Sequence, residues 1–565
     1  MNRLASLDKI IFVVYFLIVA TYGYWIYRRK KKAVTDTHDF FLAEGSLTWW
    51  AIGASLIASN ISSEQFVAMS GNGFTLGIAV AAYEWIAATA LIIVAVWFIP
   101  VYLKNKIFTM PQFLKTRYNE SVSVIMAVFW LFLYIFVNLT SILYLGAGAI
   151  SSLSGLDFHA IMIALAIFAL VITFGGMKVI GFTDVIQVVV LIIGGLVTTY
   201  VSLTLVSEKF GLGKDALAGF KKLMEDAPEH FHMIFKKPTN PHVNTPEINN
   251  YLALPGIAMY FAGQWIVNLN YWGCNQYITQ RALGANLQTA RKGILFAGFL
   301  KIMMPVIVML PGIAAFVLYK NGSLQTEMLS NGTLKADNAY SAVLGFLPTG
   351  LKGLSLAALT AAIVASLAGK ANSISTIFTL DIYQKYMNKE ATEKKLVWIG
   401  RAAILVAMVL GIAFTWKDLL GIGSDGGFTF IQKYTGLISP GVFALFILGF
   451  FWKRTTGTAA IVGLITGFVV SLFLMNNAVD VFGNENFMYT AFMNASGKYE
   501  IPFLINMGWS FVITVITMVA ISMAGPKVNP KAFAIDSSMF KVNKSTLVLI
   551  VITLILLSLL YVKFW

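Results

Sequence analysis

The chain repeats apolar segments of about 20 residues, the length that one bilayer crossing demands of a helix. The hydrocarbon core contains no water, so a single segment can satisfy its backbone hydrogen bonds there only as a helix. Of the 565 residues, 58% are hydrophobic and 12% are charged, which excludes an ordinary soluble domain. The sequence therefore predicts an all-α polytopic membrane protein.

From the length of these segments we expect about fourteen transmembrane helices. They are predicted at residues 9–27, 47–73, 77–103, 121–150, 158–175, 181–206, 252–281, 292–320, 341–384, 396–415, 427–451, 456–476, 502–525 and 545–564. The segment at 341–384 is too long for one crossing, so its C-terminal end should protrude or bend.

Lysine and arginine gather in cytoplasmic loops and so set the expected orientation. The basic clusters lie at 28–32, 104–117, 281–292, 385–395, 453–454 and 527–531. If the N-terminus is outside, all of these clusters are cytoplasmic and both termini are external. The net charge of +15 then reflects these loops and not a nucleic-acid partner. The longer outer loops should form caps over the helices.

A polar stretch at residues 60–66 interrupts one membrane-spanning segment. It contains Asn60, Glu64 and Gln65 between the apolar stretches 49–57 and 67–80. Such side chains would each cost several kcal/mol if they faced lipid, and non-helical backbone is tolerated only beside protein or a water-filled cavity. The stretch therefore predicts a binding site in a broken helix, the arrangement that secondary transporters use.

A second interruption lies at residues 263–276, about five spans later, and is again polar and punctuated by glycine. Two broken helices in corresponding positions indicate an inverted-repeat transporter. We expect the first five-helix repeat at 47–206 and the second at 252–451. An extra helix with a basic linker at 1–46, an external loop at 207–251 and further helices at 452–565 complete the division.

Several polar side chains within the spans are candidate ligands. Glu84 follows Tyr83 in an apolar helix and suits the hydroxyl groups of a sugar, although a structural carboxylate is the alternative. Lys301 should pair with a carboxylate or a ligand oxygen, unless its ammonium snorkels to the interface. Phe428 and Gln432 share one helix face, as a stacking ring and an amide would.

Two other groups of residues suit a cation. Asp184 is placed either to cap a helix or to line an ion route. The small residues Ala362, Ala365 and Ser366 permit close helix packing; alternatively, Ser366 and the carbonyls of the first break supply hard oxygen ligands. Lys370 lies one turn beyond Ser366 on the same face.

Enzymatic and ATP-driven activities are not expected. The sequence has no phosphate-binding loop pattern, no histidine spacing typical of a metal site and no evident nucleophile–base pair. No organic cofactor is predicted. The single cysteine, Cys274, excludes an internal disulfide.

The chain resembles the solute:sodium symporter family, in its sodium/glucose cotransporter group, over nearly its whole length. The segments that carry the resemblance are 39–43, 58–66, 83–85, 175–187, 271–281, 372–383 and 430–432. The resemblance implies a leucine-transporter-like fold that works by alternating access. It implies sodium-coupled uptake of a monosaccharide, with galactose or glucose expected first, into a cell through its inner or plasma membrane.

Matching positions imply the ligands. The resemblance places a sugar at Asn60, Gln65, Met69, Tyr83, Glu84, Asn268, Tyr271, Lys301, Phe428 and Gln432, with Tyr271 as the inner gate. It places sodium at the backbone carbonyls of Ala58, Ile61 and Ala362 and the hydroxyl of Ser366, and Asp184 on the ion's inward path.

The chain departs from the family pattern at Ala87, Asn270 and Ala365. Ala87 removes a hydroxyl that contacts galactose, Asn270 replaces a tyrosine beside the gate, and Ala365 replaces one of two adjacent serines at the sodium site. Lys370 is expected to point to the cytoplasmic exit. If its ammonium instead reached the sodium site, it could replace the ion and give proton-coupled or sodium-independent transport.

Other substrates remain open, among them a nucleoside, inositol, sialic acid or an amino acid. A transporter-like sensor or channel is a second class of function. The residues do not decide between a monomer and a dimer.

Overall fold

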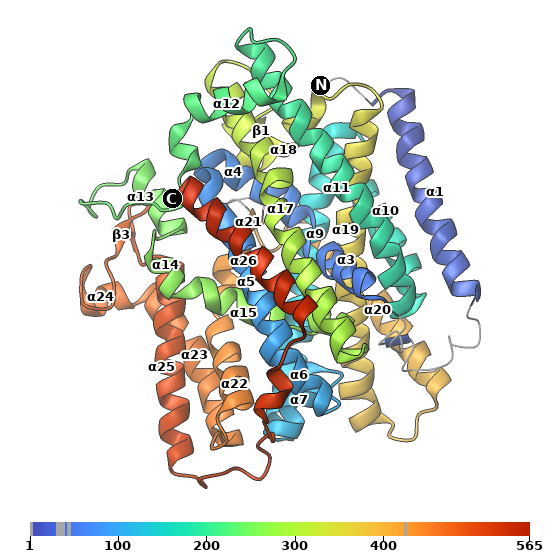
Figure 1. The fold of residues 1–565 in the computed structure, drawn as a ribbon, viewed down its shortest axis with the longest axis vertical. Helices are drawn as coiled ribbons and strands as arrows, with labels where there is room; N and C mark the ends of the chain where they lie inside the picture. The colour runs from blue at the N-terminus through green and yellow to red at the C-terminus, as the bar shows by residue number, and fades with distance from the viewer. Residues whose placement is uncertain (1–3, 30–39, 42–46, 331, 423–426) are drawn as a thin grey trace. The chain divides into compact units, whose positions relative to one another are not determined.

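The computed structural model describes residues 4–29, 40–41, 47–330, 332–422 and 427–565, and these are mostly helical (Figure 1). Within this part of the chain, ten helices are long and apolar enough to cross a membrane, or eleven if one bent pair is a single span. By length and composition, the described helices therefore do not reproduce the predicted number of fourteen membrane spans. Breaks shorten several helices, such as the 12-residue helix Trp49–Asn60, and residues 64–104 form one continuous run where two spans were predicted.

The chain divides into two compact units that interleave in sequence. The first comprises residues 1–78, 126–231 and 276–428, and the second comprises 79–125, 232–275 and 429–565. Each unit takes chain from both halves of the sequence, so the units do not coincide with the expected repeats. The division into two five-helix repeats stays a prediction.

The first unit contains most of the long helices. Its elements are α1 (Ser6–Arg29), α3 (Trp49–Asn60), the π-helical η3 (Glu64–Met69), α4 (Ser70–Leu76), η6 (Leu133–Leu139), α9 (Thr140–Ser154), α10 (Phe158–Thr173), α11 (Gly176–Lys209), α12 (Ala216–Asp226), η7 (Pro228–Phe231), α16 (Gln276–Leu283), α17 (Leu287–Lys320), the hairpin β1 (Leu329–Ser330) and β2 (Thr333–Leu334), η8 (Ala336–Asn338), α18 (Ala339–Gly345), α19 (Leu351–Thr376), η9 (Ile377–Met387) and α20 (Glu393–Thr415).

The second unit has its own set of helices. Its elements are α5 (Ala82–Ile93), η5 (Val94–Phe98), α6 (Ile99–Lys104), α7 (Met110–Arg117), α13 (Pro246–Ala253), α14 (Ala258–Phe261), α15 (Gly263–Cys274), α22 (Ser439–Phe451), α23 (Gly457–Asn476), α24 (Ala478–Phe482), the antiparallel pair β3 (Phe492–Met493) and β4 (Tyr499–Glu500), α25 (Phe503–Met523), η10 (Ser537–Phe540) and α26 (Lys544–Phe564). Three elements cross the division: η4 (Gly77–Ala81), α8 (Glu120–Phe132) and α21 (Gly427–Gly436).

Small residues let the helices of the first unit approach closely. The helix α11 packs along α19 and α17, and α3 packs against all three (Figure 1). A Cβ on Gly312 of α17 would lie 2.0 Å from the Ser70 carbonyl oxygen at the start of α4. Small residues at helix contacts are typical of membrane bundles, where dispersion and close packing drive association.

The first helix is bound to the N-terminus of α19 by a carboxylate. Asp8 of α1 is buried, and its Oδ1 accepts the amides of Gly350 at 2.7 Å and Gly353 at 2.9 Å. An anion at this position satisfies amides that have no partner within the helix and complements the helix dipole. Asp8 therefore stabilises the start of the helix that contains Ser366 and Lys370.

The second unit is held by a buried arginine as well as by packing. Arg117 at the end of α7 donates to the carbonyls of Gly449, Trp452 and Thr455, at 2.8, 2.9 and 3.0 Å. These carbonyls lie at and beyond the C-terminus of α22, where backbone acceptors lack helical partners.

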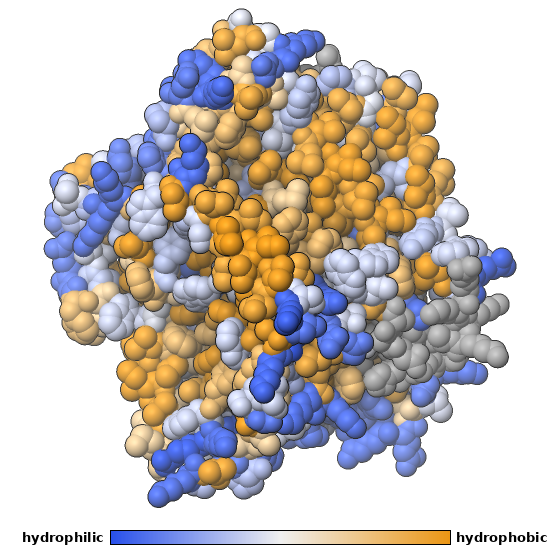
Figure 2. Space-filling view, viewed as in Figure 1, coloured by the Kyte–Doolittle hydropathy of each residue, from blue (hydrophilic) through white to orange (hydrophobic). Residues whose placement is uncertain are grey.

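Apolar side chains of α26, including Val548, Ile552 and Ile555, remain exposed (Figure 2), as expected of a helix that faces lipid.

Both predicted helix interruptions are confirmed. The first separates α3 from η3 at residues 61–63. At the second, most of the predicted stretch 263–276 is the helix α15, and the interruptions lie at its two ends: the helical segments on either side of Ala262 differ in direction by 80°, and α15 ends at Cys274 before α16 begins at Gln276. The stretch predicted at 341–384 is divided near its N-terminal end, because α18 ends at Gly345 and α19 begins at Leu351. Residues 351–387 form one continuous helical run of α19 and the π-helical η9, so the predicted bend or protrusion at the C-terminal end stays a prediction.

Candidate functional site

The first break is built by side chains that take over backbone hydrogen bonds. The amide of Ile61 still donates to Ile57, at 2.8 Å. The next amide, of Ser62, donates instead to Gln65 Oε1 at 3.1 Å, and the Glu64 amide donates to Ser62 Oγ at 3.1 Å. Because the Ser62 amide leaves the helical ladder, carbonyl oxygens at the end of α3 are released, and a helix C-terminus attracts cations.

The predicted sodium ligands lie in the first unit, on and next to two helices that pack against each other. Ser366 Oγ of α19 donates to the carbonyl oxygen of Ser59 at the end of α3, at 3.1 Å. Ala58 on α3, Ile61 directly after α3, and Ala362 on α19 are all buried, and the two helices pack against each other. Backbone carbonyls beside a hydroxyl are the hard oxygen donors that transporters use for sodium, so the donor set fits the ion.

A second hydroxyl in this region was missed by sequence reasoning. Ser59 Oγ is buried and has no hydrogen-bond partner among the described residues. It lies beside α19, because a Cβ on Gly369 would be 2.9 Å from it. This oxygen is a further candidate ligand that offsets the hydroxyl absent at Ala365. The sequence feature that could have indicated Ser59 as a ligand is its position directly before Asn60, at the start of the polar stretch.

The prediction that Lys370 points to the cytoplasmic exit is wrong. Its side chain is buried, and its Nζ donates to Ser366 Oγ at 3.2 Å. The same Nζ lies 4.0 Å from Glu64 Oε2 and 5.1 Å from the centre of the Tyr277 ring. The lysine therefore contacts the predicted sodium ligand directly, and Glu64, which was not assigned a role, is its counter-charge.

Asp184 is buried within α11, nine residues after its N-cap Gly175, so the capping alternative is wrong. Ser55 Oγ of α3 donates to Asp184 Oδ2 at 2.5 Å and accepts from Arg281 Nε at 2.8 Å. The Arg281 guanidinium lies 4.0 Å from the same carboxylate oxygen. This network places an acidic group beside α3, the element that contains the predicted sodium ligand Ala58, and its role on an ion path stays a prediction.

Part of the predicted sugar site lies in the first unit. Asn60 and Met69 are buried on either side of the break, and Lys301 is 1% exposed within α17, which packs against α3 and α4. Gln65 Oε1 accepts from the Ser62 amide and hydroxyl, at 3.1 and 3.3 Å. Gln65 thus shapes the break itself, in addition to any contact with a substrate.

The remaining predicted sugar ligands belong to α5, α15 and α21. Tyr83 and Glu84 are buried on α5, which packs against α15 with Asn268 and Tyr271. The Asn268 side-chain amide donates to the Gln264 carbonyl at 2.9 Å. Gln432 is half-buried on α21, and the side chain of Phe428 lies outside the part that the structure describes. Their assignment to a sugar is untested.

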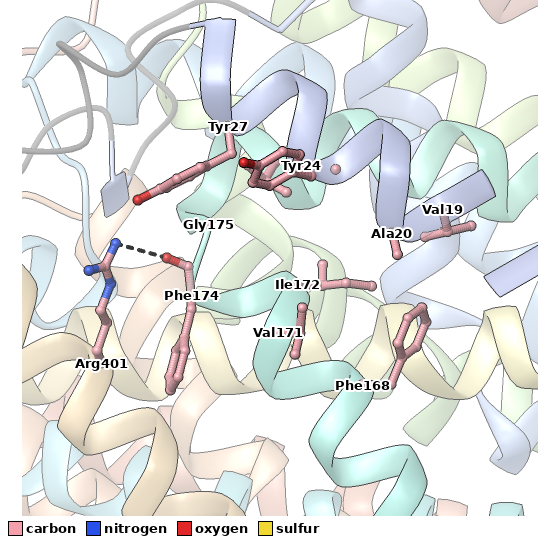
Figure 3. Close-up of a pocket in the computed structure, with 12 residues that line it drawn as sticks. Val19, Ala20, Tyr24, Tyr27, Phe168, Val171, Ile172, Phe174, Gly175 and Arg401 are labelled. Carbon is pink, nitrogen blue, oxygen red and sulfur yellow. Dashed lines mark hydrogen bonds between the residues drawn. The ribbon is translucent and has the colours of Figure 1, made fainter. Parts of the chain in front are cut away.

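The pocket shown in Figure 3 is a different feature of the first unit. It has a volume of about 290 Å³ and is lined by α1, α10, the start of α11 and Arg401, whose guanidinium donates to the Phe174 carbonyl at 3.1 Å. Its other lining side chains are aliphatic and aromatic, and none of the predicted ligands lines it. It does not suit a polyhydroxylated substrate.

Replacing Ser366 with alanine is expected to weaken sodium binding about 10- to 100-fold, since a hydrogen-bonding group that interacts with a charge contributes about 1.5–3 kcal/mol. The measurement is the sodium dependence of ²²Na⁺ binding to purified protein. Ser355→Ala is the matched control: this buried serine is on the same helix but bonds to Gly194, so sodium affinity should not change. Equal loss in both variants would contradict the assignment.

Comparisons with known proteins extend these observations. The model of the sodium:solute symporter family matches residues 40–467. A sodium/glucose cotransporter of Vibrio parahaemolyticus is 42% identical over 572 residues, covering 100% of this chain and 99% of the relative. The human sodium/myo-inositol cotransporter 2 is 34% identical and covers 82% of this chain and 69% of its own length.

Solved structures show the same fold at lower identity. A sodium-coupled sialic acid symporter in a substrate-bound, outward-open state superposes with a TM-score of 0.74 at 20% identity, covering 93% of this chain and 99% of that chain. The inward-facing structure of Mhp1 gives a TM-score of 0.51 at 14% identity, covering 87% and 95%.

Proposed function

Since this chain belongs to the sodium:solute symporter family, we propose that it moves a monosaccharide, galactose or glucose first, into the cell together with sodium. It is an integral membrane transport protein. The sodium ion is a co-transported substrate. Uptake is driven by the sodium gradient through alternating access to a site at the first helix break.

The observation that carries the proposal is the oxygen cluster at the first break. Ser366 of α19 bonds to α3 at Ser59, and the proposed sugar ligands Asn60 and Gln65 follow directly in the chain. Sodium and sugar thus share one broken helix. A sodium ion that fixes this segment also fixes the sugar ligands, so each substrate should raise the affinity for the other by the same factor.

The names of the relatives support the choice of substrate. A full-length relative is a sodium/glucose cotransporter, and the rabbit sodium/glucose cotransporter 1 is 31% identical over 542 residues. Several mammalian relatives are sodium/myo-inositol cotransporters, which makes the cyclic polyol myo-inositol the second candidate. We assign the protein to the inner or plasma membrane of its cell, with both termini external.

The test is uptake of radiolabelled galactose, glucose and myo-inositol into proteoliposomes, with an inward sodium gradient against an inward potassium gradient. Accumulation above equilibrium with sodium alone supports symport and ranks the substrates. Collapsing the gradient with a sodium ionophore should abolish the accumulation. Uptake that only equilibrates, at equal rates in sodium and potassium, would contradict sodium coupling.

Replacing Glu84 with glutamine should weaken sugar binding about 10- to 100-fold, because the carboxylate accepts hydroxyl hydrogen bonds that an amide makes less well. Sodium affinity measured without sugar should stay unchanged. Sugar binding is followed by equilibrium dialysis, with Glu485→Gln, an exposed carboxylate in an outer loop of the same unit, as the control. Parallel loss of sodium and sugar binding would rule out a direct role in holding the sugar.

A further inference from the structure

The ammonium group of Lys370 contacts the hydroxyl at which the transported sodium ion is proposed to bind. The hydroxyl oxygen of Ser366 has one proton to donate and two lone pairs. The proton goes to the Ser59 carbonyl at 3.1 Å, and one lone pair accepts from Lys370 Nζ at 3.2 Å. The ammonium therefore uses one of the two acceptor positions that a sodium ligand would offer.

A sodium ion and this ammonium would repel each other on the same oxygen. Both Ser366 and Lys370 are at most 1% exposed, so water screens the repulsion poorly. Sodium binding therefore requires the ammonium to withdraw from Ser366.

Glu64 provides a place for the ammonium to withdraw to. Its Oε2 is 4.0 Å from Lys370 Nζ, farther than a direct hydrogen bond. Ser141 Oγ donates to Glu64 Oε1 at 2.6 Å, which orients the carboxylate, and Ser62 Oγ lies 3.3 Å from Oε2. A short movement of a flexible lysine would turn this contact into a direct ion pair.

The other charges near the lysine favour movement toward Glu64. Arg281 on α16 is a like charge that repels Lys370. The carboxylate of Asp184 lies 4.0 Å from that arginine. Tyr277, also on α16, presents its ring to the ammonium at 5.1 Å. Among the described groups that act on Lys370, Glu64 is the anion.

We propose that Lys370 is a tethered cation that occupies the sodium site when sodium is absent and transfers to Glu64 when sodium binds. The inference rests on the proposed sodium-coupled function and deepens it, because it makes sodium affinity the outcome of competition between two cations. The chain thereby sets the sodium concentration at which the site fills.

The test is ²²Na⁺ binding to purified protein in the absence of sugar. Lys370→Met, which keeps the length and removes the charge, should tighten sodium binding by about tenfold or more, given the repulsion between unit charges a few ångströms apart. Glu64→Gln should weaken it, because the ammonium then has no anion to receive it. A purely structural ion pair would instead lower sodium affinity in both single variants.

Two further variants keep the result interpretable. Lys370→Met/Glu64→Gln leaves no unpaired charge and should still bind sodium more tightly than the unaltered protein. Lys352→Met removes a second buried lysine of α19, whose ammonium donates to the Gly345 carbonyl. Lys352 lies about 27 Å from Lys370 along the helix, so this substitution should not change sodium affinity. Unchanged or weaker binding in Lys370→Met and in the double variant would overturn the proposal. This readout does not depend on sugar uptake, so failure of the proposed transport function is detected separately by the proteoliposome assay.

Discussion

Replacing Asp184 with asparagine is expected to destabilise the protein by about 3–5 kcal/mol, since it leaves a buried positive charge without its counter-charge. Asp184 and Arg281 are each about 1% exposed at the side chain, and Ser55 bridges them with hydrogen bonds to both. The pair and Ser55 join α11, α3 and α16, so loss of the charge should loosen α3, which contains a proposed sodium ligand. The measurement is the unfolding midpoint in detergent as a function of temperature and denaturant.

The double variant Asp184→Asn/Arg281→Met is the informative companion. Removing both charges eliminates the uncompensated ion, so the double variant should be more stable than Asp184→Asn alone. Glu120→Gln is the exposed control: Glu120 lies 2.6 Å from Lys115, and both side chains are 44% exposed, so the loss should stay below about 1 kcal/mol. A double variant less stable than Asp184→Asn would mean that hydrogen bonds, rather than charge balance, stabilise this contact.

Replacing Gly312 with alanine should destabilise the protein by at least about 1–3 kcal/mol, the usual effect of overpacking a filled interior. The added Cβ would lie 2.0 Å from the Ser70 carbonyl oxygen, and a backbone atom in a helix cannot move aside as a side chain can. The contact joins α17 to α4, directly after the π-helical segment of the first break. We therefore expect loss of sodium binding as well as of thermal stability.

Gly148→Ala is the matched control for this substitution. Gly148 lies within α9, and nothing is found within 4 Å of an added Cβ. Alanine should stabilise the helix there by about 0.5–1 kcal/mol, because glycine loses more backbone entropy on folding. If Gly312→Ala were as stable as Gly148→Ala, α4 and α17 would be able to move apart without a loss of folding free energy, and the predicted overpacking would be wrong.

The helix breaks could be predicted from the sequence, because a polar stretch within an apolar one has few solutions in a bilayer. The confirmed break at residues 61–63 was indicated by Asn60, Ser62 and Glu64. The number of spans was not reproduced, because apolar length does not show where a helix is interrupted or continues into its neighbour. The run 64–104 is the clearest case.

The set of sodium ligands stays a prediction, and the contacts of Lys370 could not be predicted. Ser366 was assigned to sodium through its family position, and in the structure its hydroxyl bonds to the carbonyl of Ser59 at the end of α3. The contact between Lys370 and Glu64 joins residues about three hundred positions apart, so nothing local in the sequence indicates it. Helical spacing placed the lysine on the face of Ser366, but only the tertiary fold, which brings Glu64 to 4.0 Å from its Nζ, determines which way its side chain points.

The carboxylate of Asp8 bears on how shorter versions of this protein should be designed. A variant trimmed to the family-matched region 40–467 would discard α1 and expose the amides of Gly350 and Gly353 that Asp8 now accepts. The helix that loses this anion is α19, which contains the proposed sodium ligands Ala362 and Ser366. Trimming at the N-terminus would therefore weaken ion binding through fraying of α19, although every residue proposed to touch sodium or sugar would still be present.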